Sequence, residues 1–247
     1  MTEEPFRWLE AVANRREYVD EQLKGGSPVF GAGLRDGILL LGVGGGQSKV
    51  FELFDRQALA GLGHPADLEK IRQTLIDAAH LESFTRAPED VSLRRLVGFG
   101  LGPQLKTNFE QIFSAPFLAE LLLAELGRAP EQDLFLRLHY DGSFEALHGG
   151  VYVAAPSKQA ETLAQKWLGT VVSTGTPLPE AVEACLQAWW IATSGLTFSP
   201  EAPPAEERRK GWRAAVEGKT VEIGWLDRQS TRPARYRVLT LADTGLN

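Results

Sequence analysis

Cysteine is almost absent from this sequence of 247 residues, which holds a single one, Cys185. One thiol cannot close an intramolecular disulfide, so a secreted scaffold held together by disulfides is excluded. It also cannot supply the several thiolates of a Cys-rich zinc module. Such low cysteine content is typical of a reducing compartment, and we expect a cytoplasmic location.

Long hydrophobic runs and an excess of positive charge are also missing. No apolar run approaches the ~20 residues of a membrane-spanning helix, and the N-terminus, Met1 to Pro5, is acidic where a secretory signal is basic. The 26 Lys and Arg residues are outnumbered by 32 Asp and Glu, which gives a formal net charge of −6. Because affinity for nucleic acid depends on clustered Lys and Arg, we expect neither a nucleic acid nor a membrane as a partner.

The spacings that mark metal and nucleotide sites are absent too. The four histidines form no His-Glu-x-x-His pair. The glycine-rich segment 42–49 superficially matches a phosphate-binding loop, but its serine precedes its lysine and a predicted strand follows. We interpret this segment as a hairpin turn and expect no metal and no cofactor.

What the sequence does contain is a regular succession of amphipathic and apolar segments. Apolar residues make up 43% of the chain, enough to bury a sizeable core. Residues 6–24 are predicted to form an amphipathic helix that ends at Gly25-Gly26. Further helices are predicted from Pro65 and over 91–112, 157–168 and 179–192, and a surface connection over 199–210. Strands are predicted at 29–34, 38–41, 50–54, 58–60, 117–126, 134–138, 151–153, 220–226 and 235–241.

The order of these segments indicates the fold class. Strands and helices occur in separate runs, without the strand-helix alternation of a doubly wound fold, so a layered α+β fold is favoured. Asp36-Gly37 predicts a tight hairpin between the first two strands, and we place the strands at 50–54 and 58–60 in the same sheet. The composition never shifts enough to divide the chain, which indicates one domain with helices outside two packed sheets.

Ser27 is a candidate nucleophile because it stands at the predicted start of the first strand. Some hydrolases place Ser, Thr or Cys there after cleavage of the preceding peptide bond, and the freed amine then acts as the base. Ser27 could attack the carbonyl of Gly26 in this way. The alternative, which we favour, is a linker between helix and strand.

A resemblance to a known family extends over nearly all of residues 7–241. The segment from Lys49 to Arg56 (Lys-Val-Phe-Glu-Leu-Phe-Asp-Arg), followed by Ala60 to Leu68 (Ala-Gly-Leu-Gly-His-Pro-Ala-Asp-Leu), resembles proteasome α-type subunits, especially those of bacteria. Collinear matches follow at 72–79, 84–91, 117–126, 140–143 and 221–227. No single motif is diagnostic, and the resemblance depends on order and spacing.

The resemblance implies the N-terminal nucleophile hydrolase fold, a four-layer α-β-β-α sandwich of two antiparallel sheets between helical layers. It implies one domain over 1–247, with a tail and helix at 1–26, the sandwich at 27–241 and a C-terminal tail at 242–247. The implied function is a non-catalytic subunit of a threonine-type endopeptidase complex. Such subunits form a seven-membered outer ring that nucleates assembly with β-type subunits and gates substrate entry. The ring also docks an ATP-dependent unfoldase, by binding the C-terminal tail of the unfoldase.

The same resemblance assigns candidate site residues. Counted from Ser27, the family's catalytic carboxylate positions hold Val43 and Trp190-Ile191, so no catalytic residue is expected. Lys49, Gly63 and His64 match the pocket that holds the activator tail. The loop that lines the axial pore matches Phe113, Ser114, Ala115 and Pro116. Two alternatives stay open: a self-processing peptidase that uses Ser27 and loses residues 1–26, and a stand-alone proteasome-like ring.

Overall fold

Ten strands form two antiparallel sheets in the computed structural model, which describes residues 4–194 and 204–246. The first sheet has the order β10-β9-β2-β1-β8 and the second the order β3-β4-β5-β6-β7. The first contains β1 (Val29–Leu34), β2 (Gly37–Gly44), β8 (Val151–Ala154), β9 (Thr220–Asp227) and β10 (Tyr236–Leu239). The second contains β3 (Val50–Phe54), β4 (Gln57–Gly63), β5 (Ala119–Glu125), β6 (Leu134–Leu138) and β7 (Phe144–His148).

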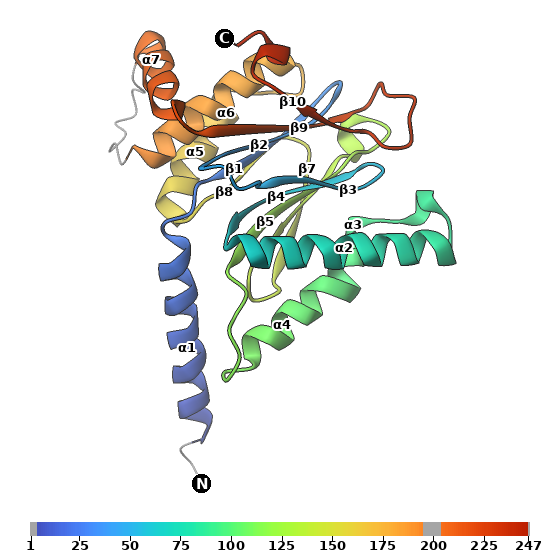
Figure 1. The fold of residues 1–247 in the computed structure, drawn as a ribbon, viewed down its shortest axis with the longest axis vertical. Helices are drawn as coiled ribbons and strands as arrows, with labels where there is room; N and C mark the ends of the chain where they lie inside the picture. Colours follow the sequence, from blue (N-terminus) through green and yellow to red (C-terminus); the bar gives the residue numbers. More distant parts are fainter. Residues whose placement is uncertain (1–3, 195–203, 247) are drawn as a thin grey trace.

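Helices cover the outer face of each sheet, which completes four layers (Figure 1). The first sheet is covered by α5 (Lys158–Val171) and α6 (Leu178–Thr193), and α7 (Ala205–Val216) packs on α6. The second sheet is covered by α2 (Pro65–Thr85) and α4 (Gly102–Glu110). The predicted α-β-β-α sandwich is therefore confirmed. Among the described residues, no helix combines the length and apolar character needed to cross a membrane.

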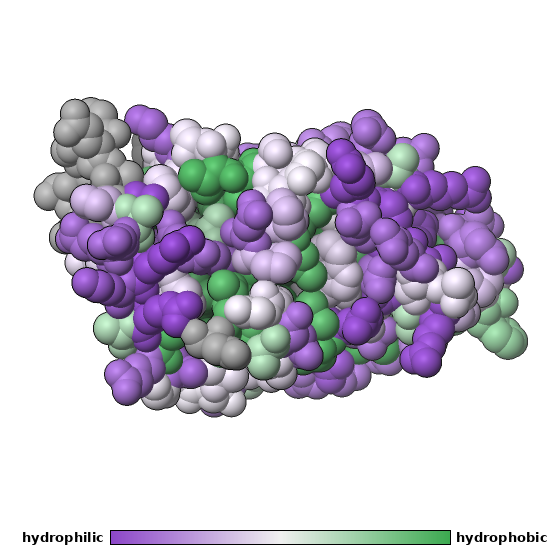
Figure 2. Space-filling view, turned by 90° about the horizontal axis from the view of Figure 1, so that it is seen from above, coloured by the Kyte–Doolittle hydropathy of each residue, from purple (hydrophilic) through white to green (hydrophobic). Residues whose placement is uncertain are grey.

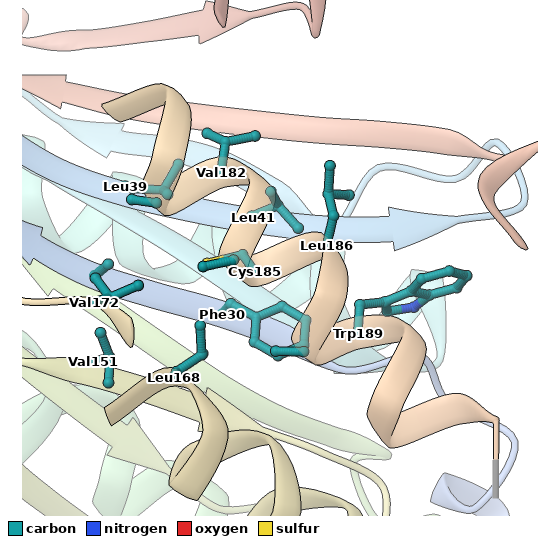
Figure 3. Packing of buried hydrophobic residues seen from close by; sticks show 14 of the residues in the cluster. Phe30, Leu39, Leu41, Val151, Leu168, Val172, Val182, Cys185, Leu186 and Trp189 are labelled. Carbon is teal, nitrogen blue, oxygen red and sulfur yellow. The ribbon is translucent and has the colours of Figure 1, made fainter. Parts of the chain in front are cut away.

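Three hydrophobic clusters hold the layers together. Figure 3 shows the outer one, in which Phe30 and Leu41 of the first sheet face Cys185 and Trp189 of α6. A second cluster, which includes Leu40 and Phe135, fills the space between the sheets, and a third joins the second sheet to α2 and α4. Because the central strands β1, β2 and β5 are covered on both faces, every residue in them is buried.

The N-terminal helix α1 (Glu4–Leu23) leaves the sandwich at one end (Figure 1). Its C-terminal half is part of the domain, since Val19 and Leu23 are buried in the cluster between the sheets. Arg15 fixes it further by donating to the carbonyl oxygen of Asn108, at 3.1 Å. Its N-terminal half projects beyond the sandwich, where Leu9 is 65% exposed. The predicted helix over 6–24 is therefore confirmed, with two halves in different surroundings.

One prediction about strands was wrong, and one strand was missed. β3 and β4 belong to the second sheet, not the first, because β2 already pairs with β1 on one side and β9 on the other. β7 was not predicted; four of its five residues are exposed at the sheet edge, so the segment lacks the apolar alternation of a half-buried strand. The hairpin at 140–143 joins β6 to β7.

Two predictions about helices need correction. Residues 205–210, expected as surface connection, begin α7, whose Trp212 is buried; Pro204 directly precedes the helix rather than breaking it. Residues 199–203 of that prediction lie outside the described part. The helix expected over 91–112 is interrupted: α3 (Leu93–Arg95) leads into a π-helix, η2 (Leu96–Leu101), before α4. Gly98 and Gly100 fall within η2.

The hairpin predicted at Asp36-Gly37 forms, but a glycine is needed at position 37 for a different reason than the turn. Leu34 pairs with Gly37, so the loop is Arg35-Asp36 and Gly37 is the first residue of β2. A Cβ at Gly37 would lie 2.1 Å from the carbonyl oxygen of Leu226. The glycine therefore serves the close approach of β9 rather than the turn.

Candidate functional site

An open cleft of about 760 Å³ lies where α1 meets the first strand. It is enclosed by the segment before β1, the loop between β2 and β3, the start of α2, the C-terminal part of α6 and the turn between α7 and β9. Its lining residues are Gly25, Gly26, Ser27, Val43, Gly44, Gly45, Gln47, Ser48, Lys49, Gly63, Pro65, Leu68, Trp189, Trp190, Thr193, Ser194, Ala215 and Lys219.

Ser27 contacts hydrogen-bond donors in this cleft. The indole Nε1 of Trp189 donates to the Ser27 Oγ at 2.8 Å, and the Nζ of Lys49 donates to the main-chain oxygen of Ser27 at 3.3 Å. An indole N–H is a donor only, so it cannot accept the hydroxyl proton. No carboxylate or imidazole is among the lining residues that the structure describes. The indole therefore holds the hydroxyl oxygen and does not take its proton.

Lys49 is half-buried and carries its charge without a close carboxylate at its Nζ. Burial lowers the pKa of its ammonium, and the nearby Glu222 opposes this only in part. The carboxylate of Glu222 accepts instead from the main-chain N–H groups of Lys49, at 2.9 and 3.0 Å, and Val50, at 3.2 Å. Lys49 therefore presents a partly desolvated cation to the cleft, which suits an anionic ligand.

The positions that the family resemblance compares with catalytic carboxylates are apolar here. Val43 is fully buried and lines the cleft, as does Trp190. Ile191 is buried and is not part of the lining. None of these side chains can orient an amine or hold its proton.

Of the other two docking candidates, the structure brings only Gly63 to the cleft. Gly63 has φ +137°, and a Cβ there would lie 1.9 Å from the carbonyl oxygen of Leu118. The approach of the chain before β5 is therefore sufficient reason for the glycine. His64 is exposed beside the cleft, where its Nδ1 accepts from the N–H of Ala66 at 3.3 Å and caps α2.

The loop of residues 113–116 lies apart from this cleft, between α4 and β5. Phe113 is fully exposed, and it borders a smaller cavity of about 400 Å³ with Trp8 of α1. Asn108 holds the base of the loop: its Nδ2 donates to the Ala115 oxygen at 3.3 Å, and its Oδ1 accepts from the Phe117 N–H at 3.2 Å. The loop thus has a fixed base and an exposed tip beside α1.

Sequence reasoning missed two members of the cleft, Trp189 and Lys219. Trp189 falls within the helix predicted over 179–192 and received no role of its own, and its bond to Ser27 joins residues 162 positions apart. Lys219 follows a helix that was itself not predicted. Within residues 4–194 and 204–246, no group of three potential metal ligands comes together.

Two packed antiparallel sheets between helical layers, with a projecting helix before the first strand, define a proteasome-like α+β sandwich. No family model matches the sequence. A curated relative named Proteasome subunit alpha, from Streptomyces avermitilis, is 30% identical over 230 residues, which cover 92% of this chain and 82% of the relative.

Relatives with the same name occur in other bacteria. One from Pseudarthrobacter chlorophenolicus is 28% identical over 240 residues, covering 93% of this chain and 92% of the relative. One from Frankia casuarinae is 27% identical over 237 residues, covering 95% and 92%. The chain belongs to the proteasome α-subunit family.

Proposed function

We propose that this chain is a non-catalytic subunit of a proteasome core particle, in which it forms the outer ring. The single observation that carries the proposal, beyond family membership, is the surroundings of Ser27. The hydroxyl accepts from the Trp189 indole, and no carboxylate or imidazole is among the described residues that line the cleft. Peptide hydrolysis in the complex, a threonine-type endopeptidase, then belongs to a β-type subunit.

Ring assembly is the part of this function assigned to α1. Its projecting half exposes Trp8 and Leu9 at 47 and 65%. Apolar side chains exposed together in this way are a liability in a lone subunit and suit a contact with a neighbour. A ring of seven copies would cover them, and the single domain over 1–247 would then be the repeating unit.

Activator docking is assigned to the cleft at Lys49, with Gly63 as a second lining residue and His64 at its margin. The C-terminal carboxylate of an ATP-dependent unfoldase supplies the anion that Lys49 lacks. The exposed tip of residues 113–116 is assigned to the axial pore, where it would contact entering polypeptide. The proteasome complex acts in the cytoplasm.

Native mass spectrometry of the tagged full-length chain, purified from its own cell, tests this function. We expect a particle that contains a second type of proteasome subunit, and peptide hydrolysis by the particle but not by the isolated chain. Recovery of a chain that lacks residues 1–26 and hydrolyses peptides by itself would contradict the proposal and favour the peptidase alternative.

A truncation tests the role of α1 separately. Deleting residues 1–14 removes the projecting half and keeps Arg15, Val19 and Leu23, which are buried against the sandwich. We expect the shortened chain to stay folded and fail to form rings. Complete rings of the truncated chain would show that the projecting half is not the ring contact.

A further inference from the structure

The cleft at Ser27 holds two cations and no anion. Lys49 and Lys219 are the charged residues in its lining, and neither Asp nor Glu occurs among the described residues that line it. The chain as a whole carries a formal charge of −6. A cleft of the opposite sign, in a molecule with excess negative charge, concentrates anions locally.

Lys219 is held at the cleft by an aromatic contact rather than by an ion pair. Its Nζ lies 5.8 Å from the centroid of the Trp189 ring, within the range of a cation–π contact. The indole is fixed in turn by its bond to Ser27. The main chain of Lys219 is set by a tight turn, in which its N–H donates to the Val216 oxygen at 2.9 Å. Its ammonium, which makes no ion pair with a described residue, remains available to a ligand.

The acidic side chain that acts on Lys49 does not pair with its ammonium. Glu222 is not among the residues that line the cleft, and its carboxylate accepts from the main-chain N–H groups of Lys49 and Val50. Both lysines are also linked to the same pair of residues, Lys49 through the Ser27 oxygen and Lys219 through the Trp189 ring. Because an extended peptide advances about 3.3 Å per residue, the last few residues of one tail can reach both cations.

We propose that the cleft selects a peptide tail with two negative charges: a C-terminal carboxylate held by Lys49 and an acidic side chain a few residues upstream held by Lys219. The inference rests on the proposed docking function and adds the chemistry of the tail. Lys49 recognises any free C-terminus, whereas Lys219 distinguishes an acidic tail from a neutral one. Trp189 and Trp190 contribute apolar surface to the same cleft.

Three sets of four matched synthetic peptides, one set for each position of the upstream residue, separate the two contacts. Each is a fluorescent heptapeptide with the same apolar residues, with either glutamate or glutamine upstream and either a free or an amidated C-terminus. The upstream residue is tested two, three and four positions from the end. Binding to the full-length protein is followed by anisotropy at low and at physiological salt.

We expect the best glutamate peptide to bind about threefold to fivefold more tightly than its glutamine partner at low salt, since Lys219 is exposed and its ion pair is screened. Lys219→Ala should remove this preference and leave the preference for a free C-terminus. Lys49→Ala should do the reverse. Lys166→Ala, which removes an exposed lysine of α5 outside the cleft, is the matched control for net charge.

The outcomes distinguish this inference from the function on which it rests. A glutamate preference that survives Lys219→Ala, or no preference in the parent protein at any of the three positions, overturns the role of Lys219 alone. Equal binding of free and amidated peptides to the parent overturns docking at Lys49, and the inference falls with it.

Discussion

Arg228 and Lys49 lie at opposite ends of the first sheet, and their charges are satisfied differently. At the β1–β2 hairpin end, Arg228 donates to both carboxylate oxygens of Asp133, at 3.0 and 2.7 Å. It also donates to the carbonyl oxygens of Gly127, at 2.7 Å, and Arg35, at 3.0 Å. At the other end, the Lys49 ammonium donates to one carbonyl oxygen.

The difference separates a structural cation from one available to a ligand. A bidentate pair with added carbonyl acceptors uses nearly all the donors of a guanidinium, so Arg228 holds loops together. Lys49 has two of its three donors without a described protein acceptor. Figure 2 shows hydrophilic residues toward both ends of the molecule, and Figure 1 places the β9–β10 loop, which carries Arg228, at the right-hand end.

The largest effect, a loss of folding stability, is expected from breaking the ion pair of Arg228 and Asp133. Arg228→Ala leaves the side chain of Asp133, which is fully buried, without its partner. Burial already raises the pKa of this carboxyl, and Arg228 opposes the rise. Removing one partner of a buried pair typically costs about 3–5 kcal/mol of folding stability. Urea unfolding measures the loss, with Arg232→Ala, an exposed arginine of the same loop, as control. A loss below about 1 kcal/mol would contradict a structural role for the pair.

The second-largest effect is expected at the Lys49 end of the sheet, where the ammonium has no carboxylate partner among the described residues. Lys49→Ala should leave folding stability nearly unchanged and weaken binding of an activator tail by about 2–5 kcal/mol, since it removes one partner of a partly desolvated pair. That loss is about 25-fold or more in affinity. Titration with the tail peptide measures it, together with urea unfolding of the same variant. Equal binding by variant and parent would mean that Lys49 is not the anchor.

The third effect tests whether the cleft is inert. Ser27→Ala deprives the buried indole N–H of Trp189 of its acceptor, and we expect a loss of about 1 kcal/mol in folding stability. Peptide hydrolysis by the assembled particle should not change. Turnover by the pure chain that disappears in Ser27→Ala would instead identify Ser27 as a nucleophile.

The smallest expected effect is a change in folding stability with pH, which depends on the pair of His139 and Glu120. The Nδ1 of His139 lies 2.7 Å from the Glu120 Oε2, and this hydrogen bond raises the pKa of His139 above 6.5 against the effects of burial and of Arg137. A raised histidine pKa contributes stability that is complete below about pH 6.5 and is lost as pH rises through the folded-state pKa. The pair is partly exposed, so the change should stay below about 1 kcal/mol.

His139→Gln provides the comparison for this pH effect. The other charged groups near the imidazole are Arg137 of β6 and Asp141 of the following turn, and both stay charged over this range. Unfolding midpoints of parent and variant should therefore converge as pH rises from 6 to 9. A constant difference across that range would show that the pair does not titrate with folding.

Much of the architecture could be predicted from the sequence because its signals are local. The period of 3.6 over residues 6–24 and the continuous apolar runs of β1, β2 and β5 each report burial of a single segment. The collinear match around Lys49 then gave the family, which the relatives confirm. The absence of carboxylates at Val43 and Ile191 could likewise be read from the chain alone.

Only the tertiary structure decided which segments meet. β3 joins the second sheet because both edges of β2 are already paired. β7 lies at a sheet edge, where most of its residues are exposed, so its sequence has no apolar alternation. The bond from Trp189 to Ser27, and the placement of Lys219 on the same ring, join residues far apart in the sequence. Periodicity reports which face of a segment is buried, not what that face contacts, so the sequence determined the layers and the folded chain determined the contents of the cleft.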